Sequence, residues 1–241
     1  MRKTNSLKNI IGSMASNIIT IIIGLVAQAL FIKILGSEYL GLNGLFSNVI
    51  TMLGIVELGV GNAIIYNLYK PIAENNINKI KSLMNFYKKS YRIIAGIVLI
   101  VGIAIIPLLP FFVEEVTIDI NIDLVYFLFL IDVVCSYLLS YKRSILYANQ
   151  KNYIINFIHI GYTILLNIFQ LLILYFTKDY YLYLIIKIAM RILENLVISK
   201  IADRKYSYIN EKADKLDKET EKDIFTKVKA LFFHKIGSFI V

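Results

Sequence analysis

The sequence is poor in the residues that build soluble catalytic centres and covalent cross-links. Its 241 residues include one cysteine, Cys135, and two histidines. An internal disulfide is therefore impossible, and clusters of the cysteine–histidine type that bind zinc are absent. No phosphate-binding glycine loop, nucleophile elbow or HExxH motif occurs either. We do not expect an enzyme, and the chemistry of the chain has to be sought among other residues.

The chain is instead rich in apolar residues, which make up 58% of it and give a mean hydropathy of +0.67. Six apolar runs each exceed the roughly 20 residues that a helix needs to cross about 30 Å of hydrocarbon. They cover residues 10–35, 42–69, 91–113, 122–147, 153–177 and 180–201. Runs of this length exclude the short alternating strands of a membrane barrel. The sequence thus predicts an all-α, polytopic membrane bundle with six transmembrane helices in residues 1–201.

Positive charge falls almost entirely into every second gap between these runs. Twenty-two of the 26 lysines and arginines lie in residues 1–9, 70–92, 142–151 and 200–235. The positive-inside rule places these four segments, together with the N-terminus, in the cytoplasm. The net charge of +9 is then explained by contact with anionic membrane lipids. We therefore expect no nucleic-acid partner.

The C-terminal part of the chain has a different composition. Residues 202–223 are charged and nearly free of apolar side chains, which predicts a cytoplasmic linker. In residues 224–241, Ile224, Val228 and Leu231 recur at helical spacing. Two interpretations of this segment are open. It is either a helix lying in the membrane interface or the lead-in to a seventh span that is cut off.

Three ionisable residues of the sixth run share one helical face. Counted from the outer surface, Lys187 lies roughly 10 Å deep, Arg191 roughly 16 Å and Glu194 roughly 21 Å. Their spacings of four and three residues bring them to the same side of a helix. Ionisable groups inside a membrane are costly, and they indicate a functional site by default. Lys187 and Arg191 are therefore candidate substrate-binding residues, with a structural ion-pair cluster as the alternative.

Three more residues join Glu194 as candidates for ion or proton coupling or for structural ion pairs. Glu57 lies about 18 Å from the cytoplasmic end of its run, Asp132 about 13 Å from the outer end, and His159 about 9 Å from the cytoplasmic end. If both bases of the sixth run pair with acids, one carboxylate remains to bind a proton or a cation. A structural partner for those bases is the simpler interpretation of a buried acid. A satisfied core histidine is the simpler interpretation of His159.

Three stretches of the chain resemble one family of membrane proteins. They read LKNIIGSMASNIITIIIGL, LGSEYLGLNGLFSNVITMLGIVELGVGNAIIYNLYKPIAENN and KVKALFFHKIGSFIV. With six runs followed by a charged segment, the chain resembles bacterial polysaccharide and O-antigen flippases. These belong to the MATE-like multidrug/oligosaccharidyl-lipid/polysaccharide exporter superfamily. The resemblance implies that the chain is the N-terminal half, one six-helix lobe, of a two-lobe transporter.

The resemblance also implies a function, a location and partners. The function is transport of undecaprenyl-pyrophosphate-linked oligosaccharide units across the bacterial cytoplasmic membrane, for capsule, O-antigen or exopolysaccharide synthesis, by alternating access. H⁺ or Na⁺ would act as coupling ion, with no other cofactor. The partners would be membrane lipids, a C-terminal lobe and a polysaccharide polymerase complex.

Other functions remain open beside this one. A multidrug or small-metabolite exporter of the same superfamily is the alternative within transport. A membrane-embedded glycosyltransferase or polymerase needs a large outer loop that carries catalytic residues, and the outer connections here are short. A membrane scaffold without transport activity would not need the ionisable residues inside the spans.

Overall fold

A computed structural model of the chain describes residues 2–57, 60–113 and 118–240, and every regular element in these ranges is helical. In chain order the elements are α1 (Arg2–Leu35), α2 (Ser37–Leu53), the 3₁₀ helix η1 (Gly54–Glu57), α3 (Val60–Ala73), α4 (Ile77–Ile105), η2 (Ile106–Phe111), α5 (Ile122–Leu138), α6 (Tyr141–Ala148), α7 (Asn152–Thr177), α8 (Tyr180–Lys205), η3 (Ser207–Asn210) and α9 (Lys218–Ile240). The all-α prediction is confirmed for these residues.

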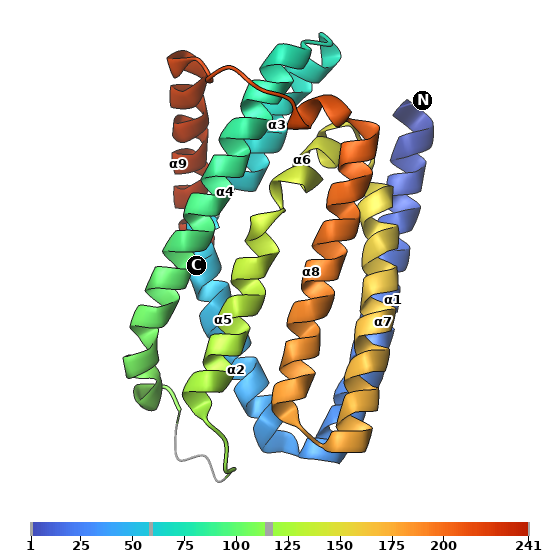
Figure 1. Cartoon of the computed structure of the whole chain (residues 1–241), viewed down its shortest axis with the longest axis vertical. Coiled ribbons are helices and arrows are strands. Elements are labelled where there is room, and N and C mark those ends of the chain that lie inside the picture. Colours follow the sequence, from blue (N-terminus) through green and yellow to red (C-terminus); the bar gives the residue numbers. More distant parts are fainter. Residues whose placement is uncertain (1, 58–59, 114–117, 241) are drawn as a thin grey trace.

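The long helices pack side by side into one bundle (Figure 1). α8 packs between α5 and α7, α1 packs along α7, and α4 packs against α5. α2 contacts α5 and α4, while α3 contacts α4 and α6. Helices that are far apart in the sequence therefore lie next to one another, and α8 has a neighbour on each side within the bundle.

The connections between helices alternate between the two ends of the bundle. One end holds the start of α1 and the connections 74–76, 149–151 and 206–217 (Figure 1). We call it the basic end, because these connections belong to the basic segments of the sequence. The α1–α2 and α7–α8 connections lie at the opposite end. The alternation of charge along the sequence thus corresponds to two opposite ends of the bundle.

Three helical segments are long and apolar enough to cross a membrane: Asn5–Leu35, Ile77–Phe111 and Asn152–Thr177. A fourth is obtained if α5 and α6, which are bent by 48° at a short break, are taken as one span. By length and composition, the chain is therefore a membrane protein with three or four such helices in its described residues. The prediction of six spans exceeds this number.

Two of the six predicted spans differ from a long apolar helix for physical reasons. The run 42–69 is interrupted by η1, which leaves α2 with 17 residues and α3 with 14. The run 180–201 does form one long helix, α8, but this helix carries Lys187, Arg191 and Glu194 among its apolar residues. A break shortens the first, and charge lowers the hydropathy of the second.

The bend between α5 and α6 is held by polar side chains. The hydroxyl of Ser140 donates a hydrogen bond to the carbonyl of Ser136. The side-chain amide of Asn195, on α8, donates to the carbonyl oxygens of Cys135 at 3.1 Å and Ser136 at 3.4 Å. These contacts satisfy carbonyl groups that the bend removes from the helix ladder, as a kink inside a membrane requires.

Helices extend further than predicted at the basic end. α4 begins at Ile77, well before the predicted start of this span at residue 91. Its first turns are well packed, since Leu83 and Met84 are buried. The predicted linker, residues 202–223, is shorter than expected, because α8 continues to Lys205 and α9 already begins at Lys218.

α9 packs against α3 and runs along the bundle rather than across its end (Figure 1). The amine of Lys227 donates to Asn67 Oδ1, on α3, at 3.1 Å. At the start of α9, Lys79 of α4 binds Asp217 and Thr220, and these contacts hold the pKa of Asp217 well below its usual range. Residues 218–240 thus form one helix beside α3, and both interpretations of residues 224–241 stay open.

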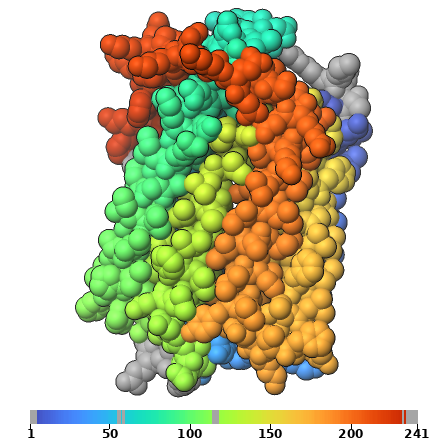
Figure 2. Space-filling model, in the orientation of Figure 1, coloured from blue at the N-terminus to red at the C-terminus, as the bar shows by residue number. Residues whose placement is uncertain are grey.

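The outer surface of the bundle is apolar, as a surface in contact with lipid requires. Figure 2 shows α4, α5, α8 and α7 side by side on one face. Exposed aliphatic side chains on these helices include Ile93 and Ile100 of α4 and Leu193 and Leu196 of α8. We therefore expect the charged side chains of α8 to lie on its inner side.

One glycine sets the close approach of α4 to α5, and its replacement tests this packing. A Cβ atom at Gly102 would overlap the side chain of Leu130, which is fully buried. We expect Gly102→Ala to lower the free energy of unfolding by about 1–3 kcal/mol, because Leu130 would have to move into filled space. Thermal unfolding in detergent measures the change. Gly96→Ala, on the same helix with open space around its Cβ, is the control. Equal effects of the two substitutions would contradict this packing.

Candidate functional site

The charged residues of α8 face the interior of the bundle. Lys187, Arg191 and Glu194 lie on the side of α8 that carries the buried residues Leu184 and Ile198. The exposed aliphatic residues of α8 lie on its other side and include Ile185, Leu193 and Leu196. The shared face that the spacing predicts is therefore directed inward, toward the helices packed against α8.

Asp132 on α5 contacts both cations of this face. Its Oδ2 lies 3.4 Å from Lys187 Nζ, and its Oδ1 accepts a hydrogen bond from Arg191 Nε at 3.2 Å. Lys187 Nζ also lies 4.5 Å from the ring centre of Phe129, and the Arg191 guanidinium lies 5.4 Å from that of Tyr162. The carboxylate offsets the repulsion between two cations one turn apart, and the aromatic faces add further attraction.

Glu194 is the centre of a second set of contacts. Its side chain is 0% exposed, and its Oε1 lies 2.9 Å from His159 Nδ1. Its Oε2 lies 3.1 Å from Arg143 Nη2 and 3.7 Å from Arg191 Nη1. A fully buried carboxylate needs such partners, because an unpaired charge is strongly disfavoured in a low-dielectric interior. Arg191 therefore joins the contacts of Asp132 to those of Glu194.

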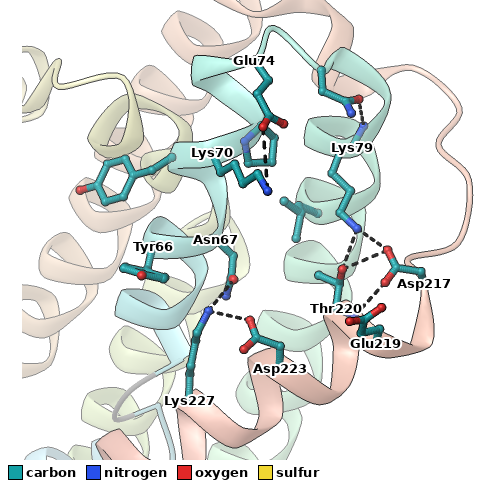
Figure 3. A pocket seen from close by; sticks show the side chains of 14 residues that line it. Tyr66, Asn67, Lys70, Glu74, Lys79, Asp217, Glu219, Thr220, Asp223 and Lys227 are labelled. Atoms are coloured by element: carbon teal, nitrogen blue, oxygen red, sulfur yellow. Dashed lines mark hydrogen bonds and ion pairs between the residues drawn. The ribbon is translucent and has the colours of Figure 1, made fainter.

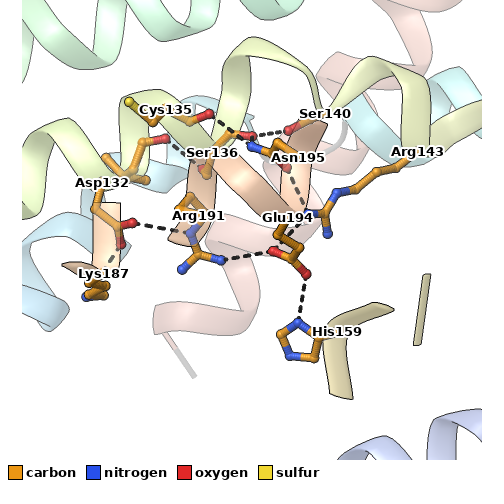
Figure 4. Close-up of polar contacts among 11 residues, drawn as sticks. Asp132, Cys135, Ser136, Ser140, Arg143, His159, Lys187, Arg191, Glu194 and Asn195 are labelled. Atoms are coloured by element: carbon orange, nitrogen blue, oxygen red, sulfur yellow. Dashed lines mark hydrogen bonds and ion pairs between the residues drawn. The ribbon is translucent and has the colours of Figure 1, made fainter. Parts of the chain in front are cut away.

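We call these residues the ionic cluster, which Figure 4 shows in detail. Its members are Asp132, Arg143, His159, Lys187, Arg191 and Glu194. Four helices, α5, α6, α7 and α8, each contribute at least one member. The side chains of Lys187 and Arg191 both remain 26% exposed. The cluster is thus open on one side rather than sealed.

His159 lies on the inner side of α7. His159 shares its side of α7 with the buried residues Ile155 and Tyr162, and its ring stacks on that of Tyr162 with 5.6 Å between centroids. Phe157 and Ile168, on the opposite side of α7, are exposed. Its side chain is 36% exposed, so the ring is only partly enclosed by its neighbours.

Arg143 is the member of the cluster that sequence reasoning missed. The charge pattern places it in the cytoplasmic segment 142–151. In the structure, the bend between α5 and α6 brings it to Glu194 and to Asn195, whose Oδ1 accepts a hydrogen bond from Arg143 Nη2 at 2.8 Å. A signal was present, because the predicted span 122–147 encloses this arginine. An arginine inside an apolar run points inward as readily as it points to the cytoplasm.

Glu57 lies in η1, at the break between α2 and α3. Its Oε1 accepts a hydrogen bond from the hydroxyl of Tyr91, on α4, at 3.1 Å. Tyr91 is buried and packs near Tyr137. In transporters, helix breaks of this kind lie at ion-binding and substrate-binding sites. Among the described residues, no three histidine, cysteine, aspartate or glutamate side chains are grouped so that they could hold a metal ion.

Two cavities lie near the basic end. One, of about 830 Å³, has amide, tyrosine and lysine side chains among its lining residues: Asn5, Tyr69, Lys70, Asn75, Asn149 and Gln150. The other, of about 840 Å³, lies between α3, α4 and the start of α9 (Figure 3). In the second cavity lysines are matched by acids, since Lys227 contacts Asp223 at 2.6 Å. The first, which we call the amide cavity, is better suited to bind hydroxyl groups of a ligand.

Comparisons of the chain with protein-family models, with curated proteins and with solved structures find no match. The family resemblance noted in the sequence therefore remains a prediction. The ionic cluster and the cavities at the basic end are the features of the structure that bear on function.

Removal of the carboxylate between the two cations tests the pairing in the cluster. Asp132→Asn leaves Lys187 and Arg191 without this partner, and we expect a loss of about 3 kcal/mol in the free energy of unfolding. Addition of Lys187→Met should restore part of the loss, because it removes one of the unpaired cations. Thermal unfolding in detergent measures both, with Lys33→Met as a control near the end of α1. A double variant no more stable than Asp132→Asn would contradict the pairing of Asp132 with Lys187 and Arg191.

Proposed function

We propose that this chain is the N-terminal, six-helix lobe of a MATE-like flippase that moves undecaprenyl-pyrophosphate-linked oligosaccharide units across the bacterial cytoplasmic membrane. The observation that carries the proposal is the ionic cluster, in which Lys187 and Arg191 stay 26% exposed on the inner side of an apolar bundle. Charge in such a position is costly and marks the path of a substrate or an ion.

Lys187 and Arg191 would bind the anionic diphosphate of the substrate. The planar guanidinium of Arg191 can donate two parallel hydrogen bonds to a phosphate group, and Lys187 adds a second positive charge one turn away. The amide cavity would offer hydrogen-bond partners to sugar hydroxyls at the end where the head group is loaded. The lipid tail would stay in contact with the apolar outer surface.

Ion coupling is assigned to the acidic residues and the histidine. Asp132 contacts two cations, which favours a structural role in holding them. Glu57, at a helix break, and the pair formed by His159 and Glu194 are then the stronger candidates for H⁺ or Na⁺ coupling. Transport itself would require a C-terminal lobe, so that the two lobes rock about the bound substrate. A polymerase complex on the outer side would receive the exported units.

Surface polysaccharide in a strain that depends on the full-length protein tests the proposal. Arg191→Ala should reduce it by about tenfold or more, because loss of one charge-assisted contact costs roughly 1.4 kcal/mol or more. Lys187→Ala should act in the same direction, whereas Lys33→Ala, which removes an exposed charge near the end of α1, should not. The amount of each variant in the membrane fraction is measured in parallel. Normal surface polysaccharide with Arg191→Ala would contradict the proposal, and loss of drug resistance instead would identify a multidrug exporter.

A further inference from the structure

The histidine of the ionic cluster, His159, contacts Glu194, which in turn lies near Arg191. An ordinary histidine gains or loses its proton between about pH 5 and 8, whereas lysine and arginine are cations throughout this range. His159 Nδ1 lies 2.9 Å from Glu194 Oε1, and the histidine side chain is 36% exposed. The ring is therefore not sealed off by its neighbours, and a proton can reach it.

The charged and titratable groups around His159 are few. From α8 it faces Glu194 and, beyond it, Arg191; from α6 it faces Arg143 through the same carboxylate; on α7 it stacks on Tyr162. α1, which packs along α7, has ionisable side chains only near its ends, at positions 2, 3, 8 and 33. Glu194 is therefore the group through which a proton on His159 influences the cations.

The charge balance of the ionic cluster depends on this proton. With a neutral histidine, the three cations Arg143, Lys187 and Arg191 face the two carboxylates of Asp132 and Glu194. A proton on His159 adds a fourth positive charge. The net charge of the cluster then matches a divalent anion, so that the occupied site is neutral, which is the favoured condition in a low-dielectric interior.

The distances within the cluster indicate how the effect passes to Arg191. Arg191 Nη1 lies 3.7 Å from Glu194 Oε2, too far for a hydrogen bond, whereas its Nε bonds to Asp132 at 3.2 Å. A protonated His159 donates a charge-assisted hydrogen bond to Glu194 and neutralises this carboxylate more fully than a neutral histidine does. The long contact between Glu194 and Arg191 then breaks most readily, and the outer guanidinium nitrogens of Arg191 become available to a ligand.

We propose that His159 and the Lys187–Arg191 pair form a proton-linked anion site, in which protonation of His159 and binding of a divalent phosphate-type or sulfate-type anion favour each other. The proposal rests on the anion-binding role given to Lys187 and Arg191 in the proposed function. Linkage requires the effect to be reciprocal, so anion binding takes up a proton and a lower pH strengthens anion binding. The anion can be free in solution or the head group of a lipid.

Binding of inorganic sulfate to the purified chain in phosphatidylcholine nanodiscs tests the proposal, because sulfate stays divalent across the pH range used. Calorimetry should find binding about tenfold tighter near pH 5.5 than near pH 7.5, because binding is linked to the uptake of a proton. His159→Asn, which keeps a polar partner for Glu194 but cannot titrate, should remove the pH dependence. Arg191→Gln should weaken binding at both pH values. Full pH dependence with His159→Asn, or none with the unmodified protein, would overturn the proposal.

Two further measurements make the test decisive. If His159→Asn does not fold, proton uptake on sulfate binding is measured with the unmodified protein in two buffers of different ionisation enthalpy. Uptake supports the proposal, and its absence overturns it.

Competition then identifies the source of the anion. Displacement of sulfate by farnesyl diphosphate but not by free diphosphate assigns a lipid head group, displacement by both assigns a free anion, and displacement by neither overturns the shared site. Sulfate binding that follows this pattern without any polysaccharide export would leave this inference standing and contradict the proposed function alone.

Discussion

The burial of charge inside an apolar bundle is the constraint on which the other features of this structure depend. α8 carries two cations and an acid on its inner side, and each needs a partner within the protein. α5 supplies Asp132, α7 supplies His159, and the bend before α6 brings Arg143 to Glu194. The position of α8 between α5 and α7 and the break between α5 and α6 are thus parts of one arrangement that neutralises these charges. The partial exposure of Lys187 and Arg191 distinguishes this arrangement from a sealed structural ion-pair cluster.

Most of the architecture can be predicted from apolar composition and charge. The long apolar runs predict the helices, and the basic segments predict which connections share an end of the bundle. The interruptions are harder to predict, because they depend on contacts between distant segments. The bend after Leu138 is held by Asn195, more than fifty residues later in the chain, so the local sequence around the bend cannot specify it alone. The span predicted to start at residue 91 belongs to a helix that begins at Ile77, because the lysine-containing turns before it pack at the basic end and continue the same helix.

Part of the candidate site could also be predicted from the sequence. Helical spacing alone places Lys187, Arg191 and Glu194 on one face, and the cost of buried charge requires an acid such as Asp132 from another helix. Which acid meets which cation is decided by helix packing, which no local pattern reports. Arg143 was assigned to a cytoplasmic segment because the charge rule treats a helix end as solvated, whereas the bend turns this end back toward α8.

The proposed function requires the charged side of α8 to border a water-filled space within the membrane. Cysteine accessibility tests it directly, with single cysteines introduced in a Cys135→Ser background. Lys187→Cys and Ile185→Cys lie about 3 Å apart in depth but on opposite sides of the helix. In intact membranes, a small membrane-impermeant methanethiosulfonate reagent should modify the cysteine at position 187 and leave that at position 185 unmodified. Protection of position 187, or equal modification of both, would contradict the proposed function.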